Sequence, residues 1–240
     1  MIYFITFDSS IPGYYQLLKY QNNLTIIGSE SDYYNPQQKI SKIIQFCQQV
    51  NPIDLICFIN PNQTIILDSP QSITEKFNSL KTQLVFSVYH PSSVFNKYLT
   101  EKQSGRCSNY LLNHQYYIGY PKSIIRLWSD YKFNQSEQQY LTQKCFLMKK
   151  DIIIDDKYKL FYHFDSNNSH NFRQQQLVVN NNTHSSGILI ISSDPKFQIN
   201  QFVDLQQLPL NLQKILNINN NSNNKNSNLM YNQTSSFVKQ

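Results

Sequence analysis

Two apolar runs separated by one polar turn constrain the fold of this chain more than any other feature. Asp54–Ile59 is apolar on both faces, which is typical of a central strand in a parallel sheet. The polar turn Asn60–Gln63 follows, and the chain returns at once to an apolar run that ends at Leu67. We therefore expect a buried strand whose carboxyl end opens into a polar loop.

The segments before this strand alternate between strand and helix patterns. Ile2–Phe7 and Leu24–Gly28 have the composition of strands, and a helix is expected over Tyr14–Tyr20. Gln37–Gln49 places its apolar residues at helical spacing, so it predicts an amphipathic helix. This order predicts an α/β fold with a doubly wound, mostly parallel sheet flanked by helices.

Such a sheet binds its ligand at the carboxyl ends of its strands. In this chain those ends are Asp8–Ser10, Ser29-Glu30 and Asn60–Gln63. All of these segments are polar, so we expect the ligand crevice to lie where they meet.

The remainder of the ordered pattern contains shorter elements. Further helices are expected at Ser72–Leu80 (with Ser72 as its cap), Lys122–Tyr131 and Glu137–Met148. Further strands are expected at Gln83–Val88, Tyr116–Tyr120, Ile152–Ile154, Tyr158–Phe164 and Ile188–Ser192. Asp155-Asp156-Lys157 would form a hairpin between two of these strands.

The organisation predicted from this pattern is one folded domain over residues 1–192 and an Asn-rich tail over residues 193–240. From about Asn217 the tail is dominated by Asn, Ser and Lys. A segment with so few apolar residues cannot bury enough surface to offset its conformational entropy, so we expect disorder there.

Charge and cysteine content narrow the possible partners. The formal net charge is +6, but the basic residues are scattered and form no stripe interleaved with aromatic residues, so nucleic acid is not an expected partner. The four cysteines include no CxxC pair, and those within apolar patterns are expected to be small core residues. Without a recognisable signal peptide or membrane segment, a cytoplasmic location and no membrane partner are expected.

Several short motifs occur in a fixed order between residues 2 and 164. The sharpest is Tyr110-Leu-Leu-Asn-His-Gln-Tyr-Tyr-Ile-Gly-Tyr120. It is similar to the motif YLNSGGFIGY of the protein family named in the next paragraph. The others are Gln38-Lys39-Ile40, Leu55–Leu67, Ser69-Pro70 with Phe77, Leu84–Ser87, Ser136–Thr142, and Ile154-Asp155 with Leu160-Phe161.

In this order the motifs resemble the amino-terminal glycosyltransferase domain of procollagen lysyl hydroxylases. The resemblance implies a GT-A-like (Rossmann-like) fold that transfers a hexose from a UDP-sugar to a hydroxyl group, with Mn²⁺ as cofactor. It implies UDP or a UDP-sugar as the ligand and leaves a glycan or protein acceptor undefined.

The chain departs from this family where the family binds its metal ion. Asn60 and Gln63 occupy the positions of the two metal-binding aspartates, with Asn62 between them. An amide brings no charge to a hard cation, so most of the Mn²⁺ ligands are lost and no metal ligand is assigned. His114-Gln115-Tyr116 also replaces a Ser-Gly-Gly segment.

The resemblance still suggests roles for individual residues. Thr6 and Asp8 lie where this fold holds uracil and ribose, and Lys39 is a candidate to offset diphosphate charge. Asn60, Asn62 and Gln63 remain candidates to contact the nucleotide. The candidate catalytic residues are Glu137, as a general base or donor-sugar contact, and Asn113, as a hydrogen-bond partner of the donor sugar.

Three readings remain open from the sequence. The first is an active transferase that uses basic side chains instead of a metal ion, and the second is a catalytically silent module that binds a nucleotide, a glycan or a protein. The third is an unrelated α/β scaffold. A silent module is expected to fill its cleft with His114, Tyr116 and Tyr117.

Overall fold

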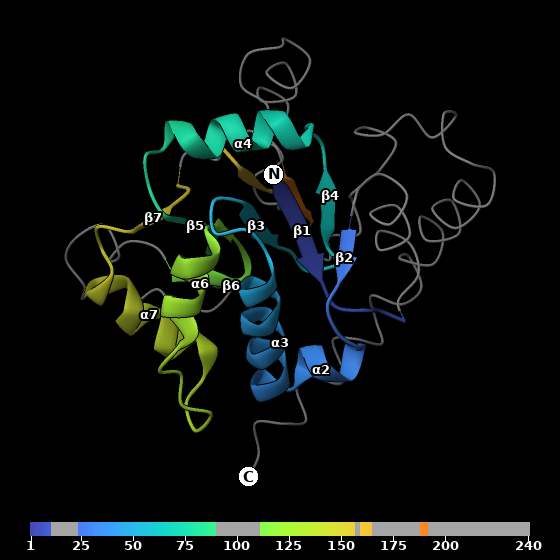
Figure 1. Ribbon diagram of the computed structural model, residues 1–240, viewed down its shortest axis with the longest axis vertical. Helices are drawn as coiled ribbons and strands as arrows, with labels where there is room; N and C mark the ends of the chain where they lie inside the picture. Colours follow the sequence, from blue (N-terminus) through green and yellow to red (C-terminus); the bar gives the residue numbers. More distant parts are fainter. Residues whose placement is uncertain (11–23, 90–110, 157–158, 165–187, 192–240) are drawn as a thin grey trace.

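The computed structural model describes residues 1–10, 24–89, 111–156, 159–164 and 188–191 (Figure 1). Its centre is a six-stranded sheet with the order β2-β1-β3-β6-β5-β7. These strands are β1 Ile2–Thr6, β2 Leu24–Ile26, β3 Leu55–Phe58, β5 Leu84–Tyr89, β6 Leu111–Gly119 and β7 Ile152–Ile154. Only β6 runs antiparallel to its neighbours β3 and β5 within this sheet. The prediction of an α/β fold with a mostly parallel sheet is therefore confirmed.

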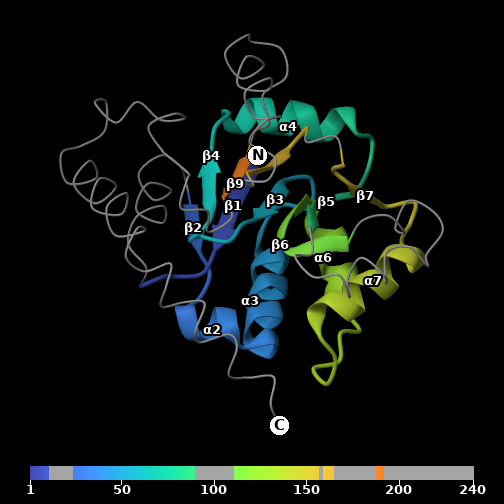
Figure 2. The same cartoon turned by 180° about the vertical axis from the view of Figure 1, so that it is seen from behind.

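Helices and a small second sheet cover the two faces of the central sheet (Figures 1 and 2). One face carries α2 Glu30–Tyr34, α3 Pro36–Gln49, α6 Pro121–Trp128 and α7 Glu137–Leu147. The other carries α4 Pro70–Ser79 and the three-stranded sheet of β4 Thr64–Ile66, β9 Ile188–Ile191 and β8 Phe161–Phe164. Each face of the central sheet thus has its own hydrophobic core.

Local sequence signals explain the long helix α3. The Asn35 side chain accepts hydrogen bonds from the N–H groups of Gln37 and Gln38, and Pro36 occupies the first helical position. Ile40, Ile43 and Cys47 then recur on one face and are buried against the sheet. This confirms the helix predicted over residues 37–49.

Two consecutive tyrosines of β6 belong to the two cores. Tyr117 lies between Phe58 and Phe86, with both ring centroids 5.2 Å from its own, and accepts a hydrogen bond from Trp128 Nε1. Tyr116 is buried in the core on the opposite face. Successive side chains of a strand point to opposite faces, so this pair stabilises both cores. The expectation for a silent module, that Tyr116 and Tyr117 fill the ligand cleft, is therefore not met, because both rings belong to the cores.

Several boundaries differ from the sequence-based expectations. The helix α4 begins one turn earlier than expected, because Ser69 rather than Ser72 accepts the capping hydrogen bond, at 3.2 Å. The strand expected at Tyr116–Tyr120 begins at Leu111. The short helix α2 was not predicted at all. The helix expected at Tyr14–Tyr20 and the tail over residues 193–240 lie outside the described residues.

The hairpin expected at Asp155-Asp156-Lys157 is also wrong. The strand before it, β7, pairs with β5 in the central sheet, whereas β8 pairs with β9 in the small sheet. The Asp155 carboxylate instead stabilises the connection between the two sheets. It accepts hydrogen bonds from the backbone N–H groups of Lys159, Leu160 and Phe161 at 2.7 to 2.9 Å. This segment therefore crosses from one sheet to the other.

The cysteines differ in chemical state. Cys47 and Cys57 carry buried free thiols, and burial raises the pKa of Cys47 to about 12. Cys145 is buried in the core, as expected for a cysteine in an apolar pattern, but it is disulfide-bonded, which the sequence did not predict. The remaining cysteine, Cys107, lies outside the described residues. Among the helices that the structure describes, none is long and apolar enough to span a membrane.

Candidate functional site

The polar ends of β1, β2 and β3 meet at one edge of the central sheet. The Asp8 N–H donates to the Gly28 carbonyl at 2.8 Å, and the Ser10 hydroxyl donates to Glu30 Oε2 at 2.6 Å. The Ser9 hydroxyl donates to Asn62 Oδ1 at 2.5 Å. The sequence-based expectation that these three segments come together is therefore confirmed.

Amide side chains dominate the part of this edge between β3 and β6. Asn60 Oδ1 accepts the Asn62 N–H at 3.0 Å, while Asn60 Nδ2 donates to Gln115 Oε1 at 3.1 Å. Asn113 Oδ1 accepts the Gln115 N–H, also at 3.0 Å. Asn60 and Asn113 are buried, whereas Asn62 and Gln115 are half-buried. We call Asn60, Asn62, Asn113 and Gln115 the amide cluster.

The donor groups of this turn do not fit the Mn²⁺ site that the family resemblance implies. A hard divalent cation needs several oxygen ligands, and at least some of them are usually carboxylates. Asn60 carries no charge, its Oδ1 already accepts a hydrogen bond, and its Nδ2 faces Gln115. Gln63 adds only another neutral, half-buried amide. Among the described residues, no group of three His, Cys, Asp or Glu side chains could hold a metal ion.

Lys39 and Glu137 form a buried ion pair next to this edge. Lys39 lies in the first turns of α3 and Glu137 is the first residue of α7. The Lys39 Nζ is 2.6 Å from each carboxylate oxygen, and the two side chains are only 5% and 9% exposed. Burial lowers the pKa of Lys39, and the Glu137 carboxylate opposes that shift. We call these two residues the Lys39–Glu137 pair.

The pairing changes the roles expected for both residues. Lys39 was a candidate to offset diphosphate charge, but its ammonium group is already neutralised by Glu137. Glu137 was a candidate general base, but the carboxylate that would accept a proton is held by Lys39. Neither charge is available to a ligand unless the pair separates.

Three further polar side chains surround the pair. The Tyr33 ring of α2 lies with its centroid 5.2 Å from Lys39 Nζ, and His114 Nε2 of β6 is 4.0 Å from Glu137 Oε2. Gln138 follows Glu137 in α7 and adjoins His114. Burial lowers the pKa of His114, with Glu137 opposing the shift, so the imidazole is neutral at pH 7. Burial also raises the pKa of Tyr33.

Sequence reasoning missed Tyr33 and Gln138 as members of this group. A signal for Tyr33 was present, since Ser29 and Asp32 have the spacing of a capping box, and they form one in the structure. That spacing predicts a helix that begins at Glu30, and such a helix includes Tyr33. Nothing in the local sequence distinguishes Gln138 from the other glutamines nearby.

Thr6 and Asp8 have different environments. Thr6 is fully buried, and its hydroxyl donates to the Ile59 carbonyl at 2.8 Å, so it ties the ends of β1 and β3 together. Asp8 is exposed at the same edge. Of the two residues expected near uracil and ribose, Asp8 has the more accessible side chain.

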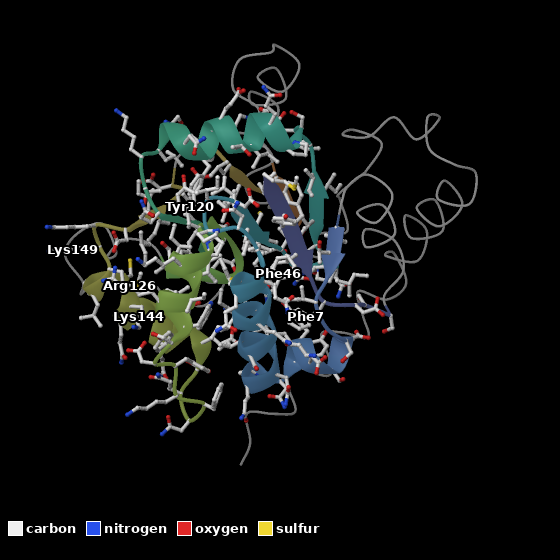
Figure 3. The ribbon with its side chains drawn as sticks, in the orientation of Figure 1. Phe7, Phe46, Tyr120, Arg126, Lys144 and Lys149 are labelled. Atoms are coloured by element: carbon white, nitrogen blue, oxygen red, sulfur yellow. The ribbon has the colours of Figure 1, made fainter. Side chains whose placement is uncertain are left out.

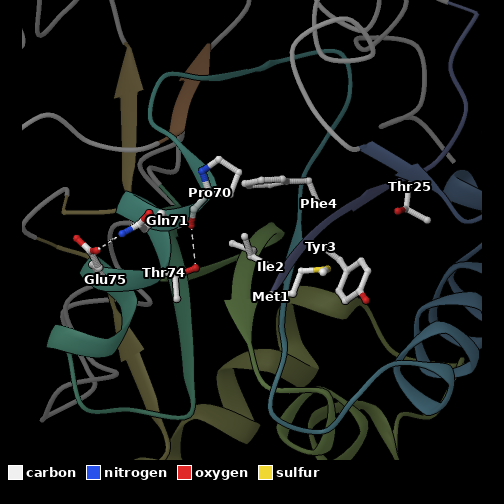
Figure 4. A pocket seen from close by; sticks show the side chains of 9 residues that line it. All are labelled: Met1, Ile2, Tyr3, Phe4, Thr25, Pro70, Gln71, Thr74 and Glu75. Carbon is white, nitrogen blue, oxygen red and sulfur yellow. Dashed lines mark hydrogen bonds between the residues drawn. The ribbon is translucent and has the colours of Figure 1, made fainter.

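An apolar groove of about 600 Å³ lies at the other end of β1 (Figure 4). It is formed by residues 1–4, by Thr25 of β2, and by the first turns of α4 from Pro70 to Glu75. Figure 4 shows the Phe4 ring beside Pro70 and the hydrogen bond between Gln71 and Glu75. The groove is therefore separate from the polar edge, which follows the carboxyl end of β1.

One basic side chain on α6, Arg126, and one on α7, Lys144, are paired with acidic neighbours, and both are labelled in Figure 3. Arg126 Nη1 is 2.9 Å from Asp151 Oδ2, and Lys144 pairs with Asp130. Figure 3 shows Lys149 extending away from the body of the protein. Arg126 and Lys144 are thus each neutralised by a carboxylate.

Comparisons with known proteins found no matching family model and no matching curated protein sequence. Among solved structures, A197 from STIV matches with 12% identity and a TM-score of 0.38, over 64% of this chain and 80% of that chain. Mouse xyloside xylosyltransferase 1, in its apo form, matches with 10% identity and a TM-score of 0.38, over 68% of this chain and 65% of that chain. The glycosyltransferase GlyE of Streptococcus pneumoniae TIGR4 matches with 12% identity and a TM-score of 0.33, over 82% of this chain and 49% of that chain. TM-scores and identities of this size establish no shared family, so the functional argument depends on the residues described above.

Proposed function

We propose that this chain is a glycosyltransferase-like domain, related to the procollagen-lysine type, that binds a nucleotide-sugar or part of one without metal-dependent transfer. One observation supports the proposal: the polar carboxyl ends of β1, β2 and β3 meet beside the amide cluster and the Lys39–Glu137 pair, whose two charges neutralise each other. Open α/β sheets bind ligands at this edge. Fold alone does not establish activity, so the proposal depends on the chemistry of these groups.

The same chemistry argues against transfer. Release of a nucleoside diphosphate requires stabilisation of the negative charge that develops on the leaving group. The buried cation at this edge is Lys39, and its charge is taken up by Glu137 at 2.6 Å. The amides at positions 60 and 63 supply no charge to a metal ion that could take its place. Among the described residues, these groups can hold a ligand but do not supply the positive charge that the reaction needs.

The amides are nevertheless suitable for recognition. Each Asn or Gln side chain offers two donor hydrogens and an acceptor oxygen, which complement the hydroxyl groups of a sugar and the edge of a pyrimidine base. Asn62 and Gln115 are half-buried, so they are held by their neighbours while remaining accessible. Such fixed and accessible groups are typical of small-molecule sites.

Thermal denaturation of the full chain tests the proposal. UDP, UDP-glucose and UDP-xylose are added at millimolar concentration, with Mn²⁺ in one series and EDTA in the other. A ligand at 100 times its dissociation constant adds about 2.7 kcal/mol to the free energy of unfolding, which raises the midpoint by a few degrees. We expect equal shifts in both series and no release of UDP from UDP-sugars on prolonged incubation.

Two outcomes would contradict the proposal. A shift that requires Mn²⁺, together with UDP release, would establish an active metal-dependent transferase. No shift with any of these ligands would favour a protein-binding scaffold instead.

A further inference from the structure

One of the three described cysteines, Cys145 of α7, is disulfide-bonded. The other two, Cys47 and Cys57, carry free thiols. The chain has four cysteines in all, so a partner within the same chain can only be Cys107, which lies outside the described residues. A disulfide within the chain would therefore join α7 to the segment that leads into β6.

The first part of β6 is weakly held by its neighbouring strands. β6 begins at Leu111, four residues after Cys107. Between Leu112 and Tyr117, four residues of β6 lie opposite one residue of β5, Ser87. The pairing with β3 covers only Tyr117 to the end of β6. A bulge of this size interrupts the ladder of backbone hydrogen bonds that fixes a strand in its sheet.

This bulged stretch carries half of the amide cluster. The Gln115 N–H donates to Asn113 Oδ1, and Gln115 Oε1 accepts from Asn60. His114 lies between these two residues of β6, and its Nε2 is 4.0 Å from Glu137 at the start of α7. The position of the amide cluster thus depends on how β6 is held against α7.

Cys145 offers a second point of attachment on the same helix. It follows Glu137 by eight residues, which is about 12 Å along a helix. Its side chain is fully buried and belongs to the hydrophobic core on that face of the central sheet. A covalent bond from this fixed position to a residue just before β6 would restrict the bulged stretch from its amino-terminal side.

We propose that Cys145 forms its disulfide with Cys107 of the same chain, and that this bond fixes the amide cluster by tying the start of β6 to α7. Formation of the bond removes two protons and two electrons from the two thiols. A disulfide oxidant such as oxidised glutathione accepts them and becomes two thiols. Cys47 and Cys57 do not compete, because burial raises the pKa of both thiols and only the thiolate exchanges.

Peptide mapping of the full chain identifies the bond. The protein is oxidised in a glutathione buffer, alkylated under denaturing conditions and digested with trypsin without reduction. Trypsin cleaves after Arg106 and Lys144, so Cys107 and Cys145 each begin a peptide. We expect two alkylated cysteines per chain and a linked pair of these two peptides. A link from Cys145 to another cysteine, a disulfide-linked dimer, or four alkylated cysteines would overturn the proposal.

Hydrogen exchange tests the effect of the bond on β6. The wild type is compared in its oxidised form and after complete reduction with dithiothreitol. Reduction should speed exchange at the backbone N–H groups of residues 111–116 by about tenfold and leave β1 and β3 unchanged, because it releases only the start of β6. The matched control is Cys107→Ser, which should exchange as fast as the reduced wild type and should not respond to dithiothreitol. Equal exchange in the oxidised and reduced wild type would overturn the proposal.

The affinity for UDP separates this inference from the proposed function. The bond and its effect on exchange are independent of that function, whereas an effect on ligand binding rests on it. Reduction should raise the dissociation constant of UDP several-fold in the wild type and leave it unchanged in Cys107→Ser. Equal UDP affinity in both forms of the wild type would show that the bond does not fix the amide cluster. Absence of UDP binding by either form would contradict the proposed function, and the exchange rates would then decide this inference alone.

Discussion

Lys39 Nζ lies 2.6 Å from both carboxylate oxygens of Glu137, although 98 positions separate the two residues in the chain. The pair connects the start of α3 to the start of α7 on one face of the central sheet. It therefore determines both how these helices are held and which charges the polar edge can offer to a ligand.

Removal of one member of this pair is expected to destabilise the protein strongly. The substitution Lys39→Met leaves the Glu137 carboxylate buried without a cation, and breaking a buried pair in this way costs about 3–5 kcal/mol. The double variant Lys39→Met/Glu137→Leu removes both charges and should recover most of this loss. Urea denaturation of the single and double variants measures both effects.

A surface ion pair provides the control for that experiment. Arg126 lies 2.9 Å from Asp151, but its side chain is 63% exposed. Replacement of Arg126 by Met should change the free energy of unfolding by less than about 1 kcal/mol. Equal losses in Lys39→Met and Arg126→Met would show that burial of the Lys39–Glu137 pair has no energetic importance.

His114 is expected to make stability depend on pH in the acid range. Burial lowers its pKa in the folded protein below the ordinary value of 6.5, so the unfolded chain binds the proton more tightly. Folding is therefore favoured most above pH 6.5, and stability falls as the pH decreases below that value. The variant His114→Gln should lack this component, and urea denaturation at pH 5, 6, 7 and 8 measures the difference in slope. Parallel pH profiles for the two proteins would contradict the prediction.

Asp155 is expected to be important for the crossing between the two sheets. Its buried carboxylate accepts the N–H groups of Leu160 and Phe161, which are themselves fully buried. Asp155→Ala leaves these donors without partners and should cost at least about 2 kcal/mol in urea denaturation, because each buried unpaired donor costs about 1–3 kcal/mol. Asp155→Asn keeps an acceptor oxygen and should lose less. Asp156→Ala, one position away and exposed, should have little effect.

This carboxylate also shows what a family motif can and cannot reveal. The sequence motif paired Ile154-Asp155 with Leu160-Phe161, and the structure provides the physical reason, since one side chain binds both backbone groups. The same residues were expected to form a hairpin because turn-forming residues separate two apolar runs. Local sequence indicates a change of direction, but the choice of partner strand depends on distant residues such as Val85 and Ile188.

The central sheet was predictable for a comparable reason. β1 and β3 are short apolar runs with polar ends, and α3 has both a cap and helical spacing, so local pattern and tertiary structure agree. The candidate site was predictable only in part. The convergence of strand ends follows from the topology of a parallel sheet. The pairing of Lys39 with Glu137 could not be predicted, since nothing in the sequence near either residue indicates the other.

Gly119 is expected to tolerate no side chain. It lies between Ile56 of β3 and Leu84 of β5, and a Cβ atom there would be 2.4 Å from Leu84 Cδ1 and 2.7 Å from the Gln83 carbonyl oxygen. The second contact is with backbone, which cannot move without disturbing the sheet. Gly119→Ala should therefore cost about 1–3 kcal/mol in urea denaturation. Lys122→Ala, at an exposed position of α6, is the control, and equal stability of the two variants would contradict the prediction.

Restoration of carboxylates at the turn after β3 tests whether a metal site once occupied it. The double variant Asn60→Asp/Gln63→Asp supplies two anionic oxygen donors where the chain has amides, and Gln115 can rotate its amide to donate to the new carboxylate. We expect Mn²⁺ to raise the thermal midpoint of this variant in the presence of UDP, as it should not in the wild type. Gln48→Glu/Gln49→Glu makes the same change in net charge at exposed positions of α3 and should not respond to Mn²⁺. If the two double variants respond alike, the turn has no special affinity for metal, and its resemblance to a metal-binding motif is coincidental.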